Sequence, residues 1–218
     1  FFKEISEDLE TPLSIYLKLM DDRNSYLFES VEGGEKWARY SIIGLPTDKK
    51  IDLSKNPLKD IENFLKQNKA QSIPDLPDFH GGLVGYFSYE TIRHIEKKLQ
   101  NSSKERLPYP DISLMVSDEV VIYDNLKKSL FIVVHGTEDT KKECHERIEL
   151  IHKKILEPLP SQKSSKKGVI NFESSVKKED YLEAIKKIKN YIVEGDVMQV
   201  VYGQEFSTKF EGSPIDLY

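Results

Sequence analysis

Residues 27–44 read LFESVEGGEKWARYSIIG, with an apolar run at each end and a glycine pair, Gly33 and Gly34, near the middle. A glycine pair between two apolar runs is typical of a turn that joins two β-strands. The pattern therefore predicts a strand over residues 26–31, a turn, and a second strand over residues 39–44.

Polar residues stand on both sides of this predicted turn. Glu29 and Ser30 close the first strand, and Lys36 and Arg39 lead into the second. A free amino acid needs a carboxylate or hydroxyl for its ammonium, a cation for its carboxylate and an apolar slot for its side chain. These residues supply both kinds of polar partner. They also suit a solvated hairpin end, so the spacing by itself leaves both interpretations open.

Composition and charge argue against several classes of protein. Charged residues make up 32% of the chain and the net charge is −5, which argues against a nucleic-acid partner. The densest basic run, residues 163–167, lies in a stretch that resembles a linker. We find neither an apolar run long enough to span a membrane nor the pattern of a signal peptide. The lone cysteine, Cys144, fits a reducing compartment, so we expect a cytoplasmic protein.

Apolar spacing predicts five helices. Thr11 and Pro12 begin a short one, Asn56 and Pro57 begin another, and the run from Tyr89 to Leu99 forms a third with Ile92 and Ile95 inward and Arg93 outward. Thr140 opens a fourth with a capping box, and its apolar stripe comprises Cys144, Ile148, Ile151 and Ile155. The fifth runs from Glu179 to Glu194 and ends at Gly195.

Further strands are predicted by short β-rich runs. One includes the glycine-spaced run 81–90, and three in quick succession, 111–116, 119–124 and 129–135, predict an antiparallel meander. Two more are expected at 169–172 and 196–207. We therefore expect an α+β fold, an antiparallel β-sheet sandwich with peripheral helices.

Residues 157–168 are rich in proline, serine and lysine, and this stretch indicates the domain organisation. It predicts one domain over residues 1–157, a linker over 158–168 and the beginning of a second domain over 169–218. Ser213 and Pro214 are a helix-start pair with four residues after them, which predicts that the chain stops short of its natural end.

Four stretches resemble anthranilate synthase component I, a chorismate-utilising enzyme family. They are residues 27–44, residues 81–90, the short motifs around Asp111, Asp118 and Asp124, and residues 181–201 with Met198-Gln199-Val200-Val201. One departure is Gly203-Gln204-Glu205, where many members have a serine or alanine before the glutamine and an arginine after it.

The resemblance implies a reaction, a partner and an inhibitor. Members convert chorismate and ammonia to anthranilate and pyruvate with Mg²⁺, and a glutamine amidotransferase subunit delivers the ammonia. They are inhibited by L-tryptophan. Carried over residue by residue, Ser30 is the first candidate for a tryptophan contact, followed by Glu29, by Arg39 with Tyr40, and by Lys36. The family's fold, an antiparallel sheet sandwich with helices outside, agrees with the fold expected above.

The family residues that hold Mg²⁺ and chorismate have no match in this sequence. We therefore predict an amino-terminal fragment that carries no catalytic residues, has its Mg²⁺ ligands elsewhere and is inactive alone. Two alternatives stay open: an aminodeoxychorismate or salicylate synthase component, and a non-catalytic amino-acid-binding regulatory module.

Overall fold

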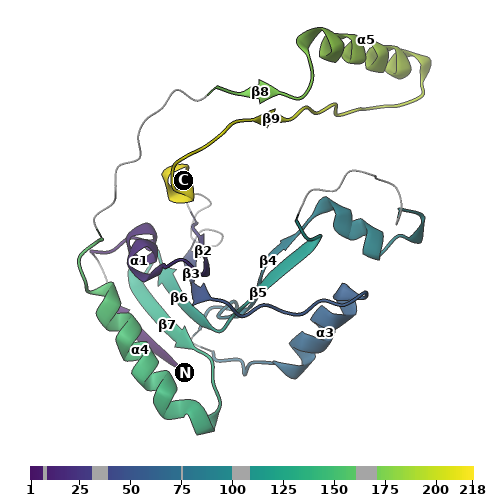
Figure 1. Cartoon of the computed structure of the whole chain (residues 1–218). Coiled ribbons are helices and arrows are strands. Elements are labelled where there is room, and N and C mark those ends of the chain that lie inside the picture. Colours follow the sequence, from purple (N-terminus) through teal and green to yellow (C-terminus); the bar gives the residue numbers. More distant parts are fainter. Residues whose placement is uncertain (7–8, 31–38, 75, 100–108, 161–170) are drawn as a thin grey trace. The chain divides into compact units, whose positions relative to one another are not determined.

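The computed structural model describes residues 1–6, 9–30, 39–74, 76–99, 109–160 and 171–218 (Figure 1). The chain divides into two compact units, Phe1–Pro160 and Ser161–Tyr218, which are described separately below. The mixture of helices and antiparallel strands confirms the expected fold class.

A five-stranded antiparallel sheet forms the centre of the first unit, in the order β1-β7-β6-β3-β2. Its strands are β1 (Phe2–Ser6), β2 (Asn24–Phe28), β3 (Tyr40–Thr47), β6 (Glu119–Asp124) and β7 (Ser129–Val134). The two strands predicted on either side of Gly33 and Gly34 are confirmed, since β2 and β3 are paired antiparallel neighbours, and the predicted turn itself lies outside the described residues. The predicted hairpin after Glu119 is confirmed as β6 and β7.

Side chains are buried on both faces of this sheet. One face packs against α1 (Pro12–Leu19) and α4 (Lys141–Ile155), and its core includes Ile43, Val121 and Ile132 (Figure 1). The other face buries Val120, Ile122 and Phe131 together with Leu76. Because neighbours along a strand point to opposite faces, β6 and β7 are apolar at nearly every position.

The expected meander is wrong at its first strand. β5 (Ile112–Ser117) does not join β6 but pairs with β4 (Gly82–Phe87) in a separate two-stranded sheet. A single residue, Asp118, separates the end of β5 from the start of β6. One residue is too short to reverse the chain into a hairpin, so the chain instead passes from one sheet to the other at this point.

Two side-chain contacts join the sheets of the first unit. The hydroxyl of Tyr26 on β2 shares a 2.8 Å hydrogen bond with the Oγ of Ser117 on β5. The imidazoles of His80 and His135 are stacked, with ring centroids 5.3 Å apart, and the Nε2 of His135 lies 2.8 Å from the carbonyl oxygen of His80. Both contacts therefore hold the base of the β4–β5 pair against the five-stranded sheet.

The predicted helices at Pro12 and Pro57 are confirmed. Thr11 caps α1, accepting a hydrogen bond from the backbone of Ser14, and α3 spans Pro57–Gln67. The helix expected over 89–99 is instead two 3₁₀ segments, η1 (Tyr89–His94) and η2 (Lys97–Leu99). A 3₁₀ helix has three residues per turn and an α-helix has 3.6, so different residues of the same sequence face inward in the two. Arg93 is buried and Ile95 is exposed, contrary to expectation.

The apolar stripe of α4 is confirmed, since its four predicted residues are all buried. The capping box lies one turn earlier than predicted. Thr137 and Thr140 form it around a short 3₁₀ segment, η3 (Glu138–Thr140), and Thr140 makes no side-chain cap of its own on α4.

The second unit contains α5 (Lys178–Glu194), β8 (Glu173–Ser174), β9 (Phe206–Ser207) and the 3₁₀ segment η4 (Pro214–Asp216). The predicted helix is confirmed, and Gly195 ends it with a φ of 84°. The long strand expected over 196–207 is wrong, because only Phe206 and Ser207 pair, with β8. The strand expected at 169–172 lies partly outside the described residues, and its described part, Asn171 and Phe172, is not strand.

Candidate functional site

The candidate amino-acid site lies at one end of the β2–β3 pair. Glu29 and Ser30 follow directly after the last residue of β2, Arg39 precedes β3, and Tyr40 is its first residue. Since Phe28 pairs with Ile42, these four residues lie at the same end of the sheet. Lys36, the fifth candidate, is outside the described residues.

Arg39 forms an ion pair with Asp124, a residue that sequence reasoning left outside the site. The Nε and Nη2 of Arg39 donate to Oδ2 of Asp124 at 3.0 and 2.6 Å. The carboxylate of Asp124 is fully buried, and Arg39 is 29% exposed. Two of the three guanidinium nitrogens are thus occupied by the protein's own carboxylate.

Asp124 also organises the turn that follows β6. Its Oδ1 accepts hydrogen bonds from the backbone N–H groups of Leu126 and Lys127, both at 3.0 Å. Burial by itself would raise the pKa of Asp124, but the hydrogen bonds from Arg39, Lys127 and Leu126 outweigh burial and lower that pKa. The same ion pair raises the pKa of Arg39. Both groups are therefore charged in the folded protein at neutral pH.

Ser41 connects the ends of the strands at this corner. Its hydroxyl is buried and accepts hydrogen bonds from the backbone N–H of Ser30 at 3.2 Å and from the side-chain amide of Asn125 at 3.1 Å. The backbone N–H of Asn125 donates to the carbonyl oxygen of Arg39 at 2.8 Å. These bonds fix the backbone of Ser30 and Arg39 relative to each other.

An aromatic ring completes the corner. The guanidinium carbon of Arg39 lies 4.8 Å from the centre of the Tyr40 ring, a cation–π contact. Tyr40 is half-buried, and this burial raises its pKa. The described residues at this corner carry a hydroxyl (Ser30), a carboxylate (Glu29), a guanidinium (Arg39) and an aromatic ring (Tyr40). These groups match the ammonium, carboxylate and side chain of a small zwitterion.

The described residues contain no cluster of the side chains that most often bind divalent metal ions. Within them, no group of three or more histidine, cysteine, aspartate or glutamate side chains converges as metal ligands would. Mg²⁺ in proteins is commonly held through carboxylate oxygens. No chemical step is assigned to Mg²⁺ in the described part of the chain.

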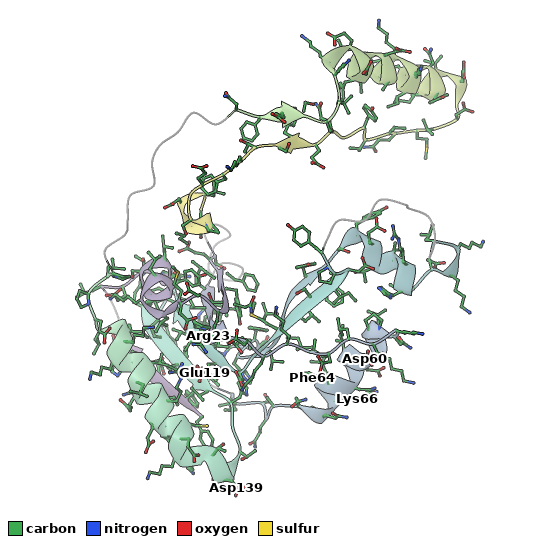
Figure 2. The ribbon with its side chains drawn as sticks, viewed as in Figure 1. Arg23, Asp60, Phe64, Lys66, Glu119 and Asp139 are labelled. Atoms are coloured by element: carbon green, nitrogen blue, oxygen red, sulfur yellow. The ribbon has the colours of Figure 1, made fainter. Side chains whose placement is uncertain are left out.

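A polar hollow of about 620 Å³ lies at the other end of the same strands, where Arg23 precedes β2 and Glu119 begins β6. Figure 2 labels these two residues. Its charged groups are largely paired with one another. Arg147 binds Glu119 with two hydrogen bonds of 2.8 and 2.7 Å, and Lys49 forms an ion pair with Asp118. This network ties α4 to β6 and leaves little charge for a ligand, so we assign it a structural role.

As for membranes, the helices in the described part of the chain are all too short or too polar to cross a bilayer.

Comparisons with known proteins agree with the resemblance noted in the sequence. The sequence model of the family described as chorismate binding enzyme matches residues 23–218. Anthranilate synthase component 1 of Pseudomonas aeruginosa is 41% identical over 243 residues, covering 99% of this chain and 49% of that protein. Its counterpart in Acinetobacter calcoaceticus is 38% identical, covering 100% and 48%.

The fold agrees as well. The crystal structure of anthranilate synthase component I from Streptococcus pneumoniae superposes with a TM-score of 0.69 at 19% identity, covering 97% of this chain and 50% of that one. The chain spans about half the length of the relatives it matches. Since the family match includes nearly the whole chain, the chain belongs to the chorismate binding enzymes and matches the amino-terminal portion of anthranilate synthase component 1.

Proposed function

We propose that this chain is the amino-terminal part of an anthranilate synthase component 1, a lyase of tryptophan biosynthesis. In the whole enzyme, chorismate and ammonia would give anthranilate, pyruvate and water. The observation that carries this proposal is the family match over residues 23–218, together with 41% identity to the Pseudomonas aeruginosa enzyme along almost the full chain. We also propose that the whole enzyme lies in the cytoplasm.

The reaction's Mg²⁺ and its source of ammonia are also proposals. We place the Mg²⁺ ligands outside this chain, and the ammonia would come from a glutamine amidotransferase subunit that binds the whole enzyme. The metal would neutralise carboxylate charge on the substrate when bound. The described residues would then contribute binding and control, with chemistry performed by residues that this chain lacks.

The control site we propose is the corner at the end of β2 and β3, with L-tryptophan as its ligand. Ser30, whose backbone is fixed by the buried Ser41, and Glu29 would bind the ammonium. Arg39 would bind the carboxylate through Nη1, because its other two nitrogens face Asp124. Tyr40 would lie beside the indole ring. Lys36 stays a candidate from sequence.

Support for inhibition at this site comes from the hydrogen bonds that join its residues to the five-stranded sheet. A ligand can shift an equilibrium between two arrangements of an enzyme only through a difference in its affinity for them. A fixed half-site on this chain, completed by residues from elsewhere, would provide that difference. The chain alone would then bind tryptophan weakly.

The test of the proposed reaction is an assay for anthranilate, which is fluorescent, with chorismate, ammonia and Mg²⁺. The 218-residue chain alone should form no anthranilate, and an enzyme that joins it to the other half of a relative should form it. Turnover by the chain alone would contradict the proposal. So would aminodeoxychorismate or salicylate as the product of the joined enzyme.

A further inference from the structure

Asn125, in the turn that follows β6, contacts both sides of the proposed control site. Its side-chain amide donates to the hydroxyl oxygen of Ser41 at 3.1 Å, and its backbone N–H donates to the carbonyl oxygen of Arg39 at 2.8 Å. The same Ser41 oxygen accepts the backbone N–H of Ser30 at 3.2 Å. A residue outside the site therefore links Ser30, proposed to bind the ammonium, with Arg39, proposed to bind the carboxylate.

Ser41 transmits the position of Asn125 to the backbone of Ser30. It is fully buried, and it lies opposite Tyr123 in the antiparallel pairing of β3 with β6. Strand pairing fixes its backbone, but its hydroxyl can still rotate between side-chain rotamers. A buried polar atom that loses a hydrogen-bond partner costs free energy, so the bond from Asn125 favours the rotamer that is seen. In that rotamer the hydroxyl oxygen also accepts the N–H of Ser30.

The turn that carries Asn125 is itself held in one shape. Oδ1 of Asp124 accepts the backbone N–H groups of Leu126 and Lys127. The N–H of Lys128 donates to the carbonyl oxygen of Asp124 at 2.9 Å, and Lys128 has a φ of 53°, in the left-handed region that residues other than glycine rarely adopt. Such a conformation persists where the surrounding structure determines it. Asn125 therefore has a defined position relative to the sheet.

The ligand proposed for this site has a fixed distance between its two charges, because an α-amino acid has a single carbon between its ammonium and its carboxylate. A site that binds both ends must hold its own groups at the matching distance, to within about 0.5 Å. We propose that Asn125 is a positioning residue that sets the distance between Ser30 and Arg39. It thereby makes the site select α-amino acids over homologues with an extra carbon between the two charges. This inference rests on the proposed tryptophan site and deepens it.

The experiment uses an enzyme that joins this chain to the other half of a relative. It measures the concentrations of L-tryptophan and of β-homotryptophan, which has the extra carbon, that halve anthranilate formation, and it measures kcat and KM for chorismate. Asn125→Ala removes the bond to Ser41 and keeps the backbone bond to Arg39. Asn125→Ser, with a short side chain that turns favour, is a second variant that loses the same bond. Lys127→Ala, in the same turn with an exposed side chain, is the matched control.

We expect wild type to need about tenfold more β-homotryptophan than tryptophan. Both Asn125 variants should need about fivefold more tryptophan than wild type, because a hydrogen bond that fixes Ser30 is lost. Their response to β-homotryptophan should change less than about twofold, so the preference for tryptophan narrows. Their kcat and KM should match those of wild type, which a general loss of structure would not allow, and Lys127→Ala should match wild type throughout.

Two kinds of failure are distinguishable. If wild type is inhibited by tryptophan but the Asn125 variants respond to it as wild type does, or lose sensitivity to both inhibitors equally, the positioning role is overturned and the proposed site stands. If wild type makes anthranilate and tryptophan does not inhibit it, the proposed site is overturned and this inference with it.

Discussion

Arg39 and Asp124 form an ion pair across 85 residues of sequence, with the guanidinium partly exposed and the carboxylate fully buried. The pair joins the start of β3 to the end of β6, at the corner that we propose binds tryptophan. It was not predicted, because sequence spacing does not show which distant carboxylate an arginine will meet.

Replacing Arg39 with methionine should lower the free energy of unfolding by about 3 kcal/mol, because it leaves a buried carboxylate without its cation. Urea unfolding at neutral pH measures this. The same substitution at Arg23, whose ion pair with Asp21 is exposed on both sides, is the matched control and should change the free energy of unfolding far less. Equal losses in the two variants would contradict the account of the buried pair.

The same ion pair makes the free energy of unfolding depend on pH. Since the pKa of Asp124 is lower in the folded protein than in the unfolded chain, its contribution is complete above the unfolded value of about 3.9. It is lost as pH falls through that value towards the lower folded pKa. The difference between wild type and Asp124→Asn should therefore shrink as urea unfolding is repeated below about pH 4. A difference that stays constant with pH would contradict this.

Gly44 should tolerate no side chain. A Cβ placed on it would lie 1.8 Å from the Tyr26 ring, so Gly44→Ala must displace that ring and its hydrogen bond to Ser117. We expect a loss of about 2–3 kcal/mol in the free energy of unfolding. Gly203→Ala, where no atom lies within 4 Å of the added Cβ, is the control and should have little effect. Equal stability of Gly44→Ala and wild type would show that Tyr26 does not pack as described.

The histidine pair predicts a second dependence on pH. Burial lowers the pKa of His80, and the neighbouring His135 lowers it further. The unfolded chain therefore takes up a proton more readily than the folded protein, and the free energy of unfolding should fall as pH drops from about 7 to about 5. His80→Gln should flatten this dependence, as measured by urea midpoints across that range. If the free energy of unfolding of His80→Gln changed with pH as steeply as that of wild type, this role of His80 would be contradicted.

Elements determined by local patterns were predictable from sequence. The cap at Thr11, the stripe of α4, the hairpin of β6 and β7 and the left-handed Gly195 all depend on residues close together in the chain. The candidate residues Ser30, Arg39 and Tyr40 stand close together in the sequence, and the pairing of β2 with β3 brings them to one end of the sheet.

Features that depend on distant partners were not predictable. The β-rich sequence of 196–207 was read as a strand, but a strand needs a neighbour, and only Phe206 and Ser207 have one. The pairing of β5 with β4 rather than β6 was missed although a signal was available, namely the single residue between β5 and β6. An α-helical period predicts Arg93 on the outer face, but the segment is a 3₁₀ helix, in which Arg93 is buried.

Inhibition by L-tryptophan tests the proposed function most directly. The measurement is the tryptophan concentration that halves anthranilate formation by an enzyme joining this chain to the other half of a relative. We predict that wild type is inhibited and that Ser30→Ala needs about tenfold more tryptophan, because a hydrogen bond to a charged group is lost. Ser25→Ala, on β2 near its other end and with its hydroxyl 3.1 Å from that of Tyr16, should match wild type. An enzyme that makes anthranilate but is not inhibited by tryptophan, or is inhibited equally in Ser30→Ala, would contradict the account.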